Sequence, residues 1–352
     1  MLHLGWFVGR GYSVHAWNQP WSGSIGSDWA SGELLTDLAR AMDRACFDYL
    51  MIEDGSFVTD AYRGSSEWHL RNAATVPKLD PMPLIPLLGH ATSRLGLVPT
   101  VTTGFYPPYL AARLAVTLDH LTGGRVGLNL VTAHNDRTAQ NFGLDRHYEH
   151  DLRYEMADEW IEVVNRLWES WEPGAVVADP ETGAFADNLK VHPIEFEGRY
   201  YRSRGPLNAP AGPQGRPVIC QAGGSPAGIA FAAKHADTIV ARARGIDGAK
   251  AYRSEVIARM AECGRRNGAT RKDDPVNPRE SGTAVSPALP SRSAARALTP
   301  LRARAARVRR SRSIFRHPSS RRLRQIALPR CSSNPPTLVN KSIRRFAMRT
   351  SN

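Results

Sequence analysis

Short apolar runs alternate along this chain with longer segments that have the apolar spacing of helices. The runs predict strands at 2–8, 49–52, 95–103, 125–132, 218–220 and 238–242. The longer segments predict helices at 34–46, 84–91, 107–120, 150–171, 229–236 and 248–265. This alternation indicates parallel βα units. Six strands are enough for an open doubly wound sheet, whereas a (β/α)8 barrel needs eight, so the pattern leaves both architectures open.

Three local features refine this pattern. Gly123 and Gly124 follow the 107–120 helix in the manner of a C-cap. Pro86 is expected in the first turn of its helix, because a proline further along removes a backbone hydrogen bond. Between the fourth and fifth strands, 172–216 is an irregular insertion rich in Pro, Gly and Asp, with a surface hairpin expected at 194–201.

The excess of positive over negative charge lies at the end of the chain. The formal net charge is +13, but residues 281–352 hold 16 Arg and one Lys and no Asp or Glu. We therefore expect a barrel-like domain at 1–268 and a basic, disordered tail rich in Arg, Ser and Pro at 269–352. A nucleic-acid-binding arm and a solvated low-complexity tail are two interpretations of this tail. We favour a third, a shifted reading frame, because the tail begins where two further βα units are due.

The cysteines, the apolar runs and the known short motifs narrow the cellular compartment and the kinds of site that we expect. Four cysteines are widely spaced without a CxxC pair, which argues against a disulfide framework and a structural zinc site and favours the cytoplasm. No apolar run approaches the roughly 20 residues of a membrane span. No group of residues has the spacing of metal ligands, and no GxSxG or Walker-type loop is present in the sequence.

The stretch 221–228, with the sequence QAGGSPAG, lies between a predicted strand and a predicted helix. Glycines let the backbone approach a phosphate closely, the first turn of the helix presents N–H groups, and the hydroxyl of Ser225 adds a donor. An ordinary tight βα turn that contains glycine is the alternative interpretation.

Polar side chains follow several of the other predicted strands. In a parallel α/β protein the ligand site lies at the carboxyl ends of the strands. His150 and Tyr154 share one face at the start of a long helix. Each candidate also has a structural interpretation, such as a turn residue for Asp54 and packing for the threonines. The candidates at strand ends are His15, Asp54, Thr100, Thr102, Thr103, Asn129, Thr132, His134 and Ser225.

Taken together, these residues resemble the FMN-dependent monooxygenase family that includes the nitrilotriacetate, pristinamycin-synthase and dibenzothiophene-sulfone monooxygenase components, a branch of the bacterial-luciferase-like superfamily. The resemblance covers about residues 2–265. It rests on 15–17 (HAW), 53–55 (EDG), 106–113 (YPPYLAAR), 117–125 (TLDHLTGGR), 129–132 (NLVT), 141–143 (NFG), 150–154 (HDLRY) and 221–225 (QAGGS).

The resemblance implies a luciferase-like TIM-type (β/α)8 barrel, here incomplete at the C-terminus. It implies an oxygenase component that takes reduced FMN from a separate NAD(P)H:flavin reductase and uses O2 to oxidise a small organic substrate with a C–N or C–S bond. FMN is expected to contact Asp54 and Thr100 on its ring side and His150, Tyr154, Gly224 and Ser225 on its phosphate side. His15 and His134 are expected to shape the peroxyflavin or substrate pocket as the catalytic residues.

Other implications and alternatives accompany this resemblance. Relatives associate, so a homo-oligomer is expected, while a membrane or nucleic-acid partner is not. Leu128 and Ile229 depart from the Trp and Arg usual in the family, and an unfinished barrel predicts a poorly stable or inactive protein. A deazaflavin-dependent dehydrogenase of the same superfamily, and nucleic-acid binding through the tail, are the alternative functions.

Overall fold

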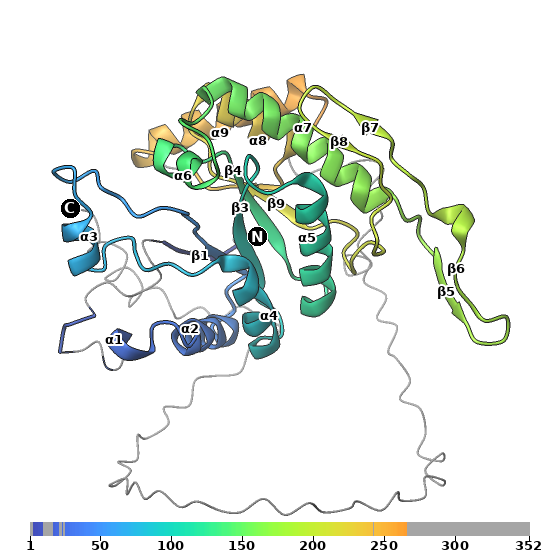
Figure 1. The fold of residues 1–352 in the computed structure, drawn as a ribbon, viewed down its shortest axis with the longest axis horizontal. Coiled ribbons are helices and arrows are strands. Elements are labelled where there is room, and N and C mark those ends of the chain that lie inside the picture. Colours follow the sequence, from blue (N-terminus) through green and yellow to red (C-terminus); the bar gives the residue numbers. More distant parts are fainter. Residues whose placement is uncertain (1–2, 10–16, 21–22, 24, 242, 266–352) are drawn as a thin grey trace, which may run out of the picture. The chain divides into compact units, whose positions relative to one another are not determined.

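The computed structural model describes residues 3–9, 17–20, 23, 25–241 and 243–265 (Figure 1). Its main sheet has the strand order β1-β2-β3-β4-β9-β10, and every neighbouring pair is parallel. The strands are β1 (Gly5–Val8), β2 (Tyr49–Ile52), β3 (Gly96–Thr102), β4 (Gly127–Val131), β9 (Val218–Gln221) and β10 (Thr238–Ile239).

This strand order separates the two architectures that the sequence leaves open. A doubly wound sheet reverses its strand order at a switch point, whereas the strands of a barrel follow one another around the axis in chain order. Here the strands of the main sheet stand in chain order throughout. The described residues thus form the parallel, barrel-type part of an α/β fold, as the resemblance implied.

Helices connect successive strands and pack against one another in chain order. Contacts join α2 to α4, α4 to α5, α5 to α7, α7 to α8 and α8 to α9. These helices are α2 (Glu33–Arg44), α4 (Pro81–Ala91), α5 (Pro108–Thr122), α7 (His150–Glu169), α8 (Pro226–His235) and α9 (Gly245–Glu262). Shorter helices are α1 (Ile25–Asp28), α3 (Glu67–Arg71), α6 (Asp136–Asn141) and the 3-10 turn η1 (Asn188–Lys190).

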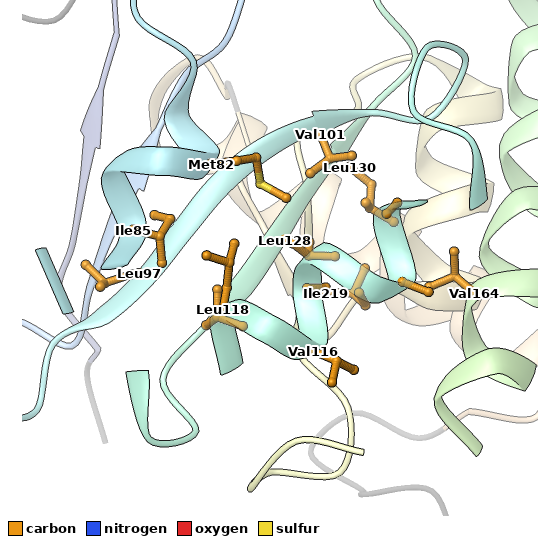
Figure 2. Close-up of a cluster of buried hydrophobic side chains, with 14 of the residues drawn as sticks. Met82, Ile85, Leu97, Val101, Val116, Leu118, Leu128, Leu130, Val164 and Ile219 are labelled. Atoms are coloured by element: carbon orange, nitrogen blue, oxygen red, sulfur yellow. The ribbon is translucent and has the colours of Figure 1, made fainter. Parts of the chain in front are cut away.

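The two faces of the sheet bury different sets of side chains. On β4, Leu128 and Leu130 pack into the larger core with residues of α4, α5 and α7, as Figure 2 shows. Successive side chains of a strand point to opposite faces, so Asn129 between them points to the other side. There a smaller apolar cluster gathers Met51, Val98 and Cys220 from three strands. The second face is therefore the inside of the barrel, and Asn129 belongs to it.

Two tryptophans of α7 fix this helix against α5 and the segment before it. The Trp160 indole, fully buried, donates a hydrogen bond to the carbonyl of Tyr106 at 2.7 Å. The Trp168 indole donates to the carbonyl of Ala112 at 3.1 Å. A buried indole is stabilising when its N–H finds such a partner. These bonds set the position of α7, whose first turn reaches the site described below.

The predicted elements recur with small shifts, and the expected C-cap is confirmed by the left-handed Gly123 (φ 65°). The expectation for Pro86 is wrong, because α4 begins at Pro81 and Pro86 lies inside the helix. The Asp80 carboxylate accepts a hydrogen bond from the Met82 N–H at 2.8 Å, and this cap starts the helix earlier than the apolar run suggested.

The segment between α7 and β9 stays outside the main sheet. It forms two antiparallel hairpins, β5 (Val176–Asp179) with β6 (Ala184–Ala186) and β7 (Phe196–Glu197) with β8 (Arg202–Ser203). The second confirms the surface hairpin expected at 194–201, and the first was missed. Because β9 pairs directly with β4, the glycine-rich loop follows the fifth strand of the main sheet.

Within the described residues, no helix is long and apolar enough to span a membrane, and no group of His, Cys, Asp or Glu side chains could hold a metal ion. The cytoplasmic location and the domain boundaries at 268 and 269 stay predictions. The basic tail, and with it every interpretation of residues 269–352, lies outside the described residues.

Candidate functional site

A cavity of about 1360 Å³ lies where the carboxyl ends of the parallel strands meet. The segments after β2, β4 and β9, residues of β3, and the first turn of α7 form its wall. Single-ligand pockets are usually about 300–1,000 Å³, so this cavity has room for a large cofactor and a small second molecule.

The structure brings together nearly all residues that the sequence singled out for a site. Those that line the cavity are Asp54, Thr100, Thr102, Asn129, Thr132, His134, His150, Tyr154, Gly224 and Ser225. They come from five separate segments of the chain. Thr103 does not line this cavity, and His15 lies outside the described residues.

The glycine-rich loop ends in a capped helix. Ser225 is the N-cap of α8, and its Oγ accepts a hydrogen bond from the Gly228 N–H at 3.1 Å. A methyl group on Gly228 would stand 2.9 Å from the Tyr154 hydroxyl and 3.0 Å from the Gly223 Cα, which is too close for either contact. At Gly224 the corresponding space is open. The loop is therefore packed on one side and open on the other, as an anion cradle requires.

The first turn of α7 lies beside this loop. The rings of His150 and Tyr154 are 5.1 Å apart, and Tyr154 also contacts Phe231 of α8 with ring centroids 5.9 Å apart. His150 Nδ1 lies 2.6 Å from a carboxylate oxygen of Asp151. A histidine, a phenol and a helix N-terminus that converge on one point form a site suited to a phosphate group.

An ion cluster further along fixes α7 to α8. The Asp158 carboxylate of α7 accepts hydrogen bonds from Lys234 and His235 of α8. Burial opposes the ionisation of Asp158, but these two partners outweigh it and lower its pKa to about 2. The cluster holds together the two helices that carry the phosphate-type groups.

On β3 and β4, a buried polar pair faces the inside of the barrel. The Thr100 hydroxyl donates to the carbonyl of Ile52 at 2.8 Å and accepts from the Asn129 amide at 2.9 Å. Among the described residues, the amide oxygen of Asn129 has no hydrogen-bond partner, although only 3% of this residue is exposed. A buried polar atom of this kind is destabilising unless a ligand or water pairs with it.

Asp54 stands at the end of β2 and accepts a hydrogen bond from the Gly55 N–H at 2.7 Å. Burial raises the pKa of Asp54, and the negative charges of Asp80 and Glu53 add to this effect, although the Gly55 N–H opposes it. A carboxylate that is costly to keep charged is typical of a functional site, because stability alone does not favour it.

A buried ion pair lies beside Asp54. Lys78 Nζ is 3.0 Å from a Glu53 carboxylate oxygen, and only 6% of the lysine side chain is exposed against 32% for the glutamate. Both residues line the cavity. The lysine charge is thus largely balanced at this end of the site.

Among the lining residues that the sequence analysis did not name are Lys78, His69 and Arg153. Arg153 donates to the carbonyl of Ala133 at 3.0 Å, and its Nε has no partner among the described residues. Asn129 carried a signal, since a polar residue between two leucines of a buried strand must face inward. His69, in the short helix α3, and Lys78 carried none, because the path of the long segment between β2 and α4 depends on the tertiary fold.

The cavity is suited to a long ligand with an anionic end. The strands from β2 to β9 are three neighbours apart, which at about 4.8 Å per strand is about 14 Å. The anion-binding loop lies at the β9 end. Asn129 lies on the neighbouring β4, Thr100 follows on β3, and Asp54 lies at the end of β2.

Comparison with known proteins agrees with this fold. The family model of luciferase-like monooxygenases matches residues 11–273, and the chain belongs to this family. Dibenzothiophene-sulfone monooxygenase from Rhodococcus erythropolis (strain XP) is 38% identical over 265 residues, 75% of this chain and 58% of that protein. Dimethyl-sulfide monooxygenase from Hyphomicrobium sulfonivorans is 40% identical over 254 residues, 72% and 52% of the two chains.

A solved structure supports the same assignment. The crystal structure of a riboflavin lyase with modified FMN and riboflavin as substrate superposes with a TM-score of 0.70 at 33% identity, covering 76% of this chain and 60% of that chain. The resemblance stated from the sequence is confirmed by these relatives, which also include nitrilotriacetate monooxygenase component A. The chain spans about half the length of the curated relatives that it matches.

Proposed function

We propose that the cavity binds FMN and that the protein acts as the oxygenase component of a two-component FMN-dependent monooxygenase. One observation carries this proposal: the capped glycine loop after β9 and Asn129 on the neighbouring β4, whose amide oxygen is unpaired among the described residues, line one cavity that continues across β3 to Asp54 at the end of β2. This extent suits a ligand with a phosphate at one end and a ring rich in hydrogen-bonding groups at the other.

At the phosphate end, three groups would hold the anion. Ser225 accepts the Gly228 N–H through its oxygen, which leaves the hydroxyl hydrogen available for a phosphate oxygen. Tyr154 and His150 add donors from the neighbouring helix, and the N-terminus of α8 adds its partial positive charge. Ile229 stands where the family usually has an arginine. Its apolar side chain is buried in the core, so it does not take over the role of that arginine towards the phosphate.

At the ring end, the polar side chains of three neighbouring strands would face the isoalloxazine. Asn129 offers its free amide oxygen to a ring N–H, and Thr100 holds the amide in place from β3. Thr100 already donates its only hydroxyl hydrogen to Ile52, so towards the ring it can act only as an acceptor. Asp54 lies next along the sheet and can accept a further hydrogen bond when ionised.

When bound and reduced, FMN supplies the electrons with which O2 is activated. The residues of this chain bind and orient the cofactor and keep water from the reacting centre. His134 lines the cavity from the loop after β4 and is our candidate, with His15, for contact with the substrate. The substrate that we propose is a small organic molecule with a C–S or C–N bond.

Such a reaction needs partners. A separate NAD(P)H:flavin reductase would supply reduced FMN, either by diffusion or in a transient complex. Homo-oligomer formation stays a prediction.

Flavin titration of the full-length protein tests the proposal. We expect stoichiometric quenching of FMN fluorescence, and oxygen-dependent substrate oxidation when a flavin reductase and NADH are added. The Asn129→Leu variant should lose most of the FMN affinity. Asn165→Leu is the matched control, because Asn165 also has a buried amide oxygen without a partner among the described residues but lies outside this cavity.

Two results would contradict the proposal. One is equal FMN binding by the two asparagine variants, which would place the ring elsewhere. The other is a preference for a deazaflavin over FMN with oxidation that needs no O2, which would favour the dehydrogenase alternative. The stoichiometric FMN binding that we expect would also contradict the separate expectation, drawn from the unfinished barrel, of a poorly stable protein.

A further inference from the structure

Tyr252 of α9 contacts the glycine-rich loop although it is not among the residues that line the cavity. Its hydroxyl donates a hydrogen bond to the Gly223 carbonyl at 2.7 Å. Burial raises the pKa of Tyr252, and the nearby Glu255 carboxylate adds to this effect. The hydroxyl therefore keeps its proton at neutral pH and can act as the donor. This bond joins α9 to a loop that forms part of the cavity wall.

Gly223 is also held at its other backbone atoms. Its N–H donates to the side-chain oxygen of Gln221 at 2.5 Å, and this glutamine is buried. A methyl group on Gly223 would stand 2.8 Å from the Gly228 Cα, so the chain is closely packed at this point. With its N–H, its Cα and its carbonyl all in contact, Gly223 sets the orientation of the peptide group that follows it.

The peptide group between Gly223 and Gly224 presents its two polar atoms to opposite sides. It is trans, and in a trans peptide the C=O and N–H bonds point in opposite directions. Because the carbonyl points to Tyr252, the Gly224 N–H points away from α9. Gly224 is exposed and lines the cavity, and its N–H makes no hydrogen bond to another described residue. A backbone N–H just before the N-cap of a helix is a suitable donor for an anion.

We propose that Tyr252 is a positioning residue for the flavin phosphate: by holding the Gly223 carbonyl, it directs the Gly224 N–H towards the phosphate. The inference rests on the proposed function, since it assumes that the phosphate of FMN occupies this loop. Without the tyrosine hydroxyl, the peptide group is free to rotate. Only the molecules whose Gly224 N–H faces the cavity then bind the phosphate fully, and the apparent affinity falls by that fraction.

Tyr252→Phe tests this role because it removes only the hydroxyl. Flavin fluorescence quenching by the full-length protein measures the dissociation constants of FMN and of riboflavin, which lacks the phosphate. We expect the variant to bind FMN about three- to tenfold more weakly than the wild type, the contribution of one hydrogen bond. Its riboflavin affinity should be unchanged. A general loosening of the fold would instead weaken both flavins alike.

Tyr200→Phe is the matched control. The Tyr200 hydroxyl also donates one hydrogen bond, to Glu155 at 2.9 Å, but lies outside the cavity, so both flavin affinities should stay as in the wild type.

Two results would overturn the role of Tyr252 alone: FMN affinity in Tyr252→Phe equal to that of the wild type, or an equal loss of affinity for FMN and riboflavin. A wild-type protein that does not bind FMN would overturn the proposed function and this inference with it.

Discussion

Replacing Ser225 with aspartate separates the two roles that this side chain has in the structure. Its oxygen caps α8 by accepting the Gly228 N–H at 3.1 Å, and in our proposal its hydroxyl also faces the FMN phosphate. Aspartate is as good an N-cap as serine and suits the positive end of the helix, so the free energy of unfolding should change by less than about 0.5 kcal/mol. Alanine cannot cap, and Ser225→Ala should lose about 1 kcal/mol.

The effect of aspartate on FMN should be large because a carboxylate would meet the phosphate. Two unit charges about 5 Å apart repel by about 3 kcal/mol at an effective dielectric constant of about 20. This is a loss of at least about a hundredfold in affinity. Ser225→Asn keeps a neutral cap and should lose far less.

Riboflavin, which lacks the phosphate, provides the internal comparison. Flavin fluorescence quenching should show that Ser225→Asp binds riboflavin as the wild type does, while its FMN affinity collapses. Urea denaturation of the same variants checks that the cap survives. An unchanged ratio of FMN to riboflavin affinity in Ser225→Asp would refute the placement of the phosphate at this loop.

Two further predictions concern the same cavity. Gly228→Ala should lower the free energy of unfolding by about 1–3 kcal/mol, because the added methyl group meets packed atoms at about 3 Å. Gly224→Ala is the control and should be tolerated, because the space there is open. Equal melting temperatures of the two variants in thermal melts would contradict this packing. Because burial raises the pKa of Asp54, the folded state holds this proton more tightly than the unfolded state, and stability is lost as the pH rises from the ordinary value of 3.8 through the folded value. In urea titrations, Asp54→Asn should therefore be more stable than the wild type at pH 7 and equal to it below about pH 3.8. The same variant should bind FMN more weakly. A variant less stable than the wild type at pH 7 would argue against burial as the cause of the raised pKa.

Much of the fold follows from local patterns in the sequence. The run Tyr49–Ile52 is a strand with its predicted bounds, and Gly123 ends α5 in the left-handed conformation that only a glycine adopts easily. The boundary errors have local causes as well. At α4 the apolar run suggested a later start, but the Asp80 carboxylate caps the helix at Pro81, which places Pro86 inside it.

The candidate site was partly predictable for a different reason. Parallel strands bring their carboxyl ends to one edge, so polar residues such as Asp54, Thr100 and Ser225 could be expected to meet there without knowing the strand order. All three line the cavity. Their individual roles could not be predicted, because a hydroxyl that caps a helix and one that bridges two strands look alike in a sequence.

By itself the sequence determined the βα alternation, the glycine loop at the start of α8 and the set of polar residues at the strand ends. These depend on interactions within a few residues, such as helical spacing and capping. The tertiary structure decided the chain-order sheet that makes the fold a barrel type, the unpaired amide oxygen of Asn129, and the pairing of Lys78 with Glu53. Each of these depends on which distant segments pack together, since burial and strand neighbours are properties of the folded chain.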